Sequence, residues 1–103
     1  MPIPRLIVPI EEDNLLRILW DDDSLSDYPF VYLRGWCPCA ACQGHSVERR
    51  FIKVNDPRLT RVSMVGNYAL TPHWADGHET GVYSFEYLRD LSVQLENENA
   101  AKG

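Results

Sequence analysis

All three cysteines of the chain stand within six residues, as Cys37, Cys39 and Cys42 of the run Cys-Pro-Cys-Ala-Ala-Cys. Zinc and iron accept thiolate ligands at about 2.3 Å, and this spacing lets one tight turn direct three sulfurs at a single point. Three thiols this close together seldom arise from packing alone. The run therefore predicts three ligands of a metal site, to which the rest of the chain must bring a fourth.

A redox dithiol made of Cys39 and Cys42 is the main competing interpretation. Such a pair normally has its first thiol at the N-terminus of a helix, where the thiolate is stabilised. No amphipathic helix pattern begins at Cys39, and no alternation of strands and helices surrounds it. Cys37 would also be left without a role, so the sequence favours metal binding.

Three histidines compete for the fourth ligand position. His45 follows Cys42 by three residues and would complete a local site, whereas His73 and His78 lie some thirty residues further along. A distant ligand would tie a later turn to the cysteines and so stabilise the whole fold. Spacing alone leaves His45 and His78 equally good.

The length of 103 residues predicts a single domain, residues 1–103, with an ordered core at about 6–95 and a loose tail at 96–103. A domain this small sits near the lower end of the range in which one hydrophobic core suffices, so a metal staple would help it. Composition is that of a folded protein, with 45% hydrophobic and 24% charged residues.

The net charge of −5 argues against a nucleic-acid binder, which would normally present a basic face. One segment is nevertheless basic, and it is read either as a solvated face or as a docking patch for an acidic partner: Arg49, Arg50, Lys53, Arg58 and Arg61. No signal peptide or membrane-spanning run is recognisable, so we expect a cytoplasmic protein without membrane contact.

Strand patterns occupy several short stretches. Residues 14–20 place Leu16, Ile18 and Trp20 on one face at a period of two, and the acidic run that follows suits a hairpin turn. Apolar and β-branched residues predict further strands at 30–33, 50–54, 62–65 and 68–71. The last two flank Gly66-Asn67, a dipeptide suited to a tight turn because both residues tolerate positive φ.

A helix is predicted from about residue 85 to residue 95. Ser84 is a suitable N-cap, and an apolar stripe at helical spacing follows it, formed by Phe85, Leu88, Leu91 and Leu95. The expected fold is therefore α+β: a small, β-rich antiparallel domain with one C-terminal helix, stapled by a Cys3His metal site.

Four stretches in combination resemble a known family, and the resemblance covers roughly residues 15–91. They are Leu16-Arg-Ile-Leu-Trp20, Tyr32-Leu-Arg-Gly-Trp-Cys-Pro-Cys-Ala-Ala-Cys42, Val65-Gly-Asn-Tyr-Ala-Leu70 and Trp74-Ala-Asp-Gly-His-Glu-Thr-Gly-Val-Tyr-Ser84. The chain resembles a stand-alone γ-butyrobetaine hydroxylase-like N-terminal domain, also called the DUF971 family. The resemblance implies a structural zinc ion held by Cys37, Cys39, Cys42 and His78, and so selects His78 over His45.

The hydroxylases that carry this domain are iron and 2-oxoglutarate dioxygenases, whose catalytic iron lies in a separate domain. None of the three histidines here opens a His-x-Asp or His-x-Glu pair of that catalytic triad, so we expect no enzymatic activity. The expected function is that of a metal-binding accessory module, with one Zn²⁺ per chain and an unidentified protein partner. Exposed parts of Tyr68, Trp74 and Tyr83 are candidate docking groups.

Two alternatives remain open. Similar domains occur attached to an iron–sulfur scaffold protein, and thiolates suit iron as well as zinc, so the site could hold Fe²⁺ or an iron–sulfur cluster. The chain could also be a non-catalytic component associated with a 2-oxoglutarate-dependent oxygenase.

Overall fold

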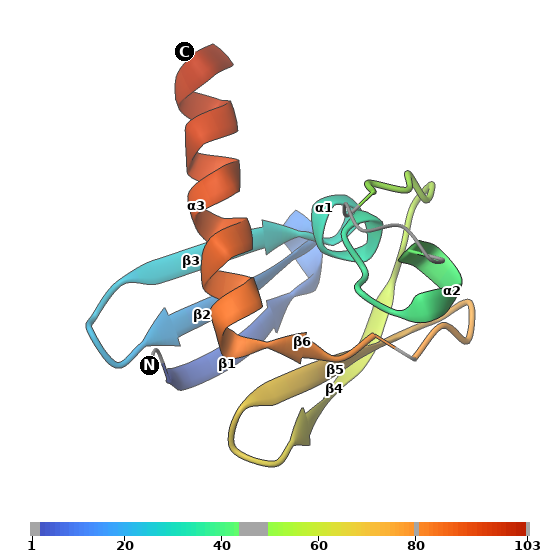
Figure 1. Cartoon of the computed structure of the whole chain (residues 1–103), viewed down its shortest axis with the longest axis horizontal. Helices are drawn as coiled ribbons and strands as arrows, with labels where there is room; N and C mark the ends of the chain where they lie inside the picture. The colour runs from blue at the N-terminus through green and yellow to red at the C-terminus, as the bar shows by residue number, and fades with distance from the viewer. Residues whose placement is uncertain (1–2, 44–49, 80, 103) are drawn as a thin grey trace.

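Two antiparallel three-stranded sheets and one long helix make up the fold of this computed structural model, which describes residues 3–43, 50–79 and 81–102 (Figure 1). The first sheet has the strand order β1-β2-β3 and the second has the order β4-β5-β6. The elements are β1 Pro4–Ile10, a 3-10 turn Glu11–Asp13, β2 Leu15–Trp20, β3 Leu25–Pro29, α1 Phe30–Gly35, α2 Ala40–Gln43, β4 Leu59–Val65, β5 Ala69–Trp74, β6 Tyr83–Ser84 and α3 Phe85–Lys102. The predicted α+β class is confirmed.

The first sheet is built on the alternating strand that the sequence predicted. Leu16, Ile18 and Trp20 of β2 are fully buried, and the antiparallel register places Tyr28 opposite Leu16 and Ser26 opposite Ile18. Because opposite residues in an antiparallel pair share a face, these side chains form one continuous buried surface, which is apolar except for Ser26. That surface is the one that packs on the helix α3.

The β4–β5 hairpin turns at Gly66-Asn67, as expected. Gly66 has φ +53°, a left-handed conformation that glycine adopts without steric cost. The hairpin pairs Val65 with Ala69 and Met64 with Leu70. It brings the end of β5 towards the loop that carries His78.

The helix α3 starts where predicted and continues further. The Ser84 hydroxyl accepts a hydrogen bond from the Tyr87 backbone N–H at 3.0 Å, which is the N-cap contact. The apolar stripe of α3 packs on the core, with Leu88 and Leu91 buried. The predicted end at Leu95 is wrong, since α3 runs to Lys102; no Gly or Pro interrupts the chain in between.

Two predicted strands are wrong. Residues 30–33 belong to the helix α1, in which the Phe30 ring meets Trp74 edge-on at 5.8 Å, so tertiary packing overrides β propensity. Residues 50–54 form no strand; Ile52 donates one backbone hydrogen bond to Gly35 at 2.9 Å, and the Phe51 ring fills the space beside Gly35. The cysteine run thus follows a helix and not a strand.

The strand β1 was not predicted, because the prolines near the N-terminus suggested an irregular lead-in. β1 is an edge strand, where proline is tolerated because half of the backbone N–H groups face away from the sheet. It pairs with β2 from Pro4 opposite Trp20 to Ile10 opposite Leu15. The ordered sheet therefore begins two residues before the expected boundary at residue 6.

The substitution Asp22→Asn should make stability less sensitive to acid. Hydrogen bonds from Ser24 and Arg89 lower the pKa of the Asp22 carboxyl to about 2, against about 3.9 in an unfolded chain. Because the folded pKa is the lower one, this stabilisation is complete above about pH 4 and is lost as the pH falls through about 2.

Urea unfolding of both proteins at pH 5 and pH 2.5 measures the effect, and other titrating groups cancel in the comparison. The wild-type protein should lose more unfolding free energy than Asp22→Asn between the two pH values. Equal losses would contradict the assigned role of Asp22.

Candidate metal centre

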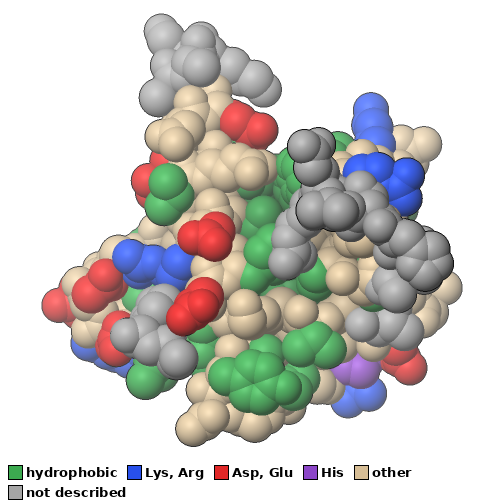
Figure 2. Space-filling model, viewed as in Figure 1, with side chains coloured by type: hydrophobic (Ala, Val, Ile, Leu, Met, Phe, Trp, Pro, Cys, Tyr) green, Lys and Arg blue, Asp and Glu red, His purple; other side chains and the backbone are tan. Residues whose placement is uncertain are grey.

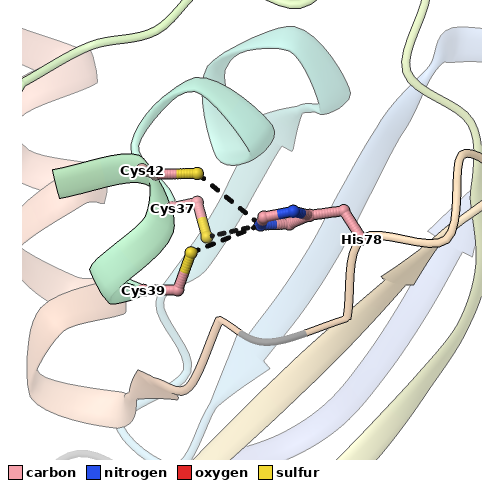
Figure 3. A group of neighbouring side chains, drawn as sticks. All are labelled: Cys37, Cys39, Cys42 and His78. Carbon is pink, nitrogen blue, oxygen red and sulfur yellow. Dashed lines mark hydrogen bonds between the residues drawn. The ribbon is translucent and has the colours of Figure 1, made fainter. Parts of the chain in front are cut away.

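Cys37 follows the end of α1, Cys39 immediately precedes the single turn of α2, and Cys42 lies within that turn (Figure 3). The backbone N–H of Cys42 donates to the carbonyl of Cys39 at 3.2 Å, which turns both side chains to the same side. His78 comes from the loop between β5 and β6 and points its ring into the space between the three sulfurs.

Four donor atoms converge on one point. The Nε2 atom of His78 lies 3.2 Å from the sulfur of Cys37, 3.5 Å from that of Cys39 and 3.6 Å from that of Cys42. All four atoms lie within 4.8 Å of one another. A tetrahedral ion with M–S near 2.3 Å and M–N near 2.0 Å requires ligand separations of roughly 3.5–3.8 Å, so these residues could hold one metal ion.

Burial makes the Cys37 thiol a poor acid. Cys37, Cys39 and Cys42 are 1%, 8% and 7% exposed. Loss of water raises the pKa of the Cys37 thiol to about 12, and the neighbouring sulfurs add to the rise. A bound cation reverses this preference, so metal binding must release protons at neutral pH.

Gln43 fixes the backbone of the cysteine run. Its side-chain amide donates to the Cys37 carbonyl at 2.7 Å and to the Arg50 carbonyl at 3.1 Å, while its carbonyl oxygen accepts from the Arg50 N–H at 2.7 Å. Gln43 is 7% exposed, so these contacts are shielded from water. Sequence reasoning missed this role, because a glutamine beside a glycine is typical of a loop.

Hydrogen bonds within the turn stabilise the segment that presents His78. Asp76 accepts a hydrogen bond from the His78 N–H at 3.0 Å, and the His78 carbonyl accepts one from the Trp74 N–H at 3.1 Å. Gly77 between them has φ +88°, which favours glycine. The turn at Asp76-Gly77 therefore directs the imidazole towards the sulfurs.

His73 has another place in the structure. Its Nε2 lies 2.7 Å from the Ser63 hydroxyl, and its Nδ1 lies 2.8 Å from a carboxylate oxygen of Glu79. Both ring nitrogens thus have partners other than the cysteine sulfurs. Since Glu79 adjoins His78, its contact with His73 also ties the ligand loop to β5. His45 lies outside the described residues.

The fold and the candidate metal centre together define the class of protein. It is a small α+β domain with two antiparallel sheets, one C-terminal helix and a Cys3His group. A family model described as "Gamma-butyrobetaine hydroxylase-like, N-terminal" matches residues 8–89. The chain belongs to that family, as the four sequence stretches indicated.

Similar proteins agree with this assignment. A crystal structure of a DUF971-family protein of unknown function from Acidithiobacillus ferrooxidans is 32% identical, with a TM-score of 0.72 over 86% of this chain and 91% of that one. A second solved structure, determined by NMR, is 26% identical with a TM-score of 0.77, covering all of this chain and 84% of the other.

The human γ-butyrobetaine dioxygenase matches over a shorter stretch. It is 44% identical over 41 residues, which are 40% of this chain and 11% of the dioxygenase. The chain thus spans only a small part of that enzyme's length, and the family match lies in the N-terminal domain. Among the described residues, no helix is long and apolar enough to cross a membrane.

Gly81→Ala should disturb the sulfur of Cys37. A Cβ atom at position 81 would stand 2.7 Å from that sulfur and 3.0 Å from the Tyr83 ring, so one of them must move. We expect metal affinity to fall by about 10–100-fold, the range typical of disturbed outer contacts. Competition with a chromophoric chelator measures it, and Val82→Ala, at an exposed neighbouring position, is the control. Unchanged affinity in Gly81→Ala would contradict the close packing.

Glu79→Gln should loosen the ligand loop. The substitution keeps the shape of the side chain but removes the carboxylate charge that faces His73. We expect metal to be released several-fold faster, measured by stopped-flow chelator transfer. Glu12→Gln, which changes an exposed carboxyl in the 3-10 turn after β1, should leave the rate unchanged. Equal rates in the two variants would show that the contact between Glu79 and His73 does not restrain His78.

Proposed function

We propose that this domain is a non-catalytic module in which Cys37, Cys39, Cys42 and His78 hold one structural Zn²⁺ and the surface binds another protein. The observation that carries the proposal is the convergence of four buried or half-buried donor atoms within 4.8 Å of one another. Four protein ligands leave no position for water or substrate, which is the arrangement of structural sites and not of catalytic ones.

The position of the site in the fold supports a structural role. The cysteines follow α1, whereas His78 belongs to the second sheet's loop. An ion there would join two parts of the chain that lie 36–41 residues apart in the sequence. Since the ligands come together only in the folded protein, metal-binding free energy becomes folding free energy.

The proposed partner is a protein, and the surface offers two kinds of contact. Trp74 and Tyr83 are buried, so these two expected docking groups are unavailable, while Tyr68 is 51% exposed. Figure 2 shows hydrophobic side chains gathered over the β4–β5 hairpin and β6, where Met64, Tyr68 and Val82 are exposed. Arg50, Lys53, Arg58 and Arg61 of the basic segment are also exposed, and Arg49 lies outside the described residues.

The relatives motivate two further candidates. The match to a dioxygenase supports an association with an oxygenase catalytic domain, in which this module contributes no catalytic residue. The same donors suit Fe²⁺ or an iron–sulfur cluster, which would make the module an iron-handling accessory protein. Colour, iron content and acid-labile sulfide separate this alternative from a colourless zinc protein.

Removal of the metal should destabilise the domain. We expect one zinc per chain by elemental analysis of protein expressed without added metal, and a fall in Tm of at least about 10 °C with a strong chelator. Each kcal/mol of lost unfolding free energy lowers Tm by about 4–8 °C in a domain of about this length.

Cys39→Ser and His78→Ala should lose most of the metal, whereas His45→Ala should keep it and so serves as the matched control. Retention of metal by His78→Ala with loss in His45→Ala would overturn the ligand set. A Tm that ignores both the chelator and Cys39→Ser would overturn the structural role.

A further inference from the structure

Arg34 is a buried cation beside the cysteine cluster. It lies in the last turn of α1 and is 8% exposed. A buried charge is costly unless a charge of opposite sign lies close to it. Among the ion pairs of the described residues, none joins Arg34 to a carboxylate.

Among the described residues, this guanidinium makes a polar contact with a cysteine sulfur. Its Nη1 donates to the Cys42 sulfur at 3.5 Å. Its Nε is buried and has no hydrogen-bond partner in the described part of the chain. The position would therefore be unfavourable beside three neutral thiols, and it becomes favourable beside thiolates.

The charges of an occupied site explain the arrangement. A divalent ion, three thiolates and a neutral imidazole sum to −1, which the +1 of Arg34 cancels. A trivalent ion would make the four-ligand centre neutral and leave Arg34 without a compensating charge. We propose that Arg34 is the built-in counter-charge of the centre, and that it makes the site select divalent over trivalent ions. This inference rests on the proposed metal site and adds its charge selectivity.

Iron provides the direct probe, because it binds thiolates in both oxidation states. A positive charge and an N–H···S contact both stabilise the more negative, reduced form of a thiolate centre. Both groups are buried, so the interaction is weakly screened by solvent. Arg34 should accordingly raise the Fe³⁺/Fe²⁺ reduction potential of the iron-loaded protein.

The experiment compares reduction potentials of the iron-loaded full chain. The native metal is removed with a chelator, Fe²⁺ is added without oxygen, and the potential is followed through the thiolate-to-Fe³⁺ absorption. Arg34→Met and Arg34→Gln remove the charge, and Arg34→Lys retains it. We expect both neutral variants to lose at least about tenfold in preference for Fe²⁺, which is a fall of about 59 mV for one electron. Arg34→Lys should retain more than half of the shift.

Arg50→Met is the matched control. The Arg50 guanidinium also contacts this region, through the Cys42 carbonyl at 3.3 Å, but Arg50 is exposed and its charge is screened by water. Its removal should change the potential by less than about 15 mV, a factor of less than two.

Equal potentials in the wild-type protein, both neutral variants and Arg34→Lys would overturn the proposal. So would an equal fall in Arg34→Lys and Arg34→Met, since that result would indicate packing and not charge. A wild-type protein that binds neither zinc nor iron would overturn the metal site itself, which is a different outcome from metal binding that is insensitive to Arg34.

Discussion

The approach of His78 to the three cysteine sulfurs is the contact on which the rest of the structure depends. The imidazole and the sulfurs lie 36–41 residues apart in the sequence, yet their donor atoms lie 3.2–3.6 Å apart. Closing a loop of this length costs conformational entropy, and ordering the side chains costs more. The surrounding residues must hold both segments in place, and an ion at their meeting point would add the strongest bond between them.

The placement of α1, and with it the cysteine run, relies on tyrosine hydroxyl groups. Tyr28 and Tyr32 donate to the carbonyls of Leu88 and Leu91 in α3, at 2.7 and 2.8 Å. Tyr83 and Tyr87 donate to carbonyls of Leu33 and Trp36, in and just after α1. Burial raises the pKa of Tyr32 to about 12 and that of Tyr83 further, so these groups remain donors. The core thus positions one half of the metal centre before any ion binds.

Much of this arrangement could be predicted from the sequence, where local pattern and final structure agree. The period-two pattern of β2, the Gly66-Asn67 turn and the Ser84 cap are each decided by neighbouring residues. The cysteine spacing likewise limits the chemistry before any fold is known. These features were recognised because short-range geometry determines them.

The wrong predictions fall where contacts between residues distant in the sequence determine the local structure. Residues 30–33 look like a strand, but contacts with Trp74 and α3 stabilise a helix. Residues 50–54 have the composition of a strand and instead pack the Phe51 ring against Gly35. Spacing alone could not choose between His45 and His78, and only the family resemblance pointed to His78. The sequence analysis did not single out Arg34, because its burial depends on how α1 packs against the cysteine cluster.

X-ray absorption at the edge of the bound metal tests the central claim most directly. The ligand set predicts three sulfur neighbours at about 2.3 Å and one nitrogen neighbour at about 2.0 Å, with the outer-shell scattering of an imidazole. In His78→Ala the imidazole signal should disappear while the sulfur shell remains. A shell dominated by oxygen, or an imidazole signal that survives in His78→Ala, would contradict the account.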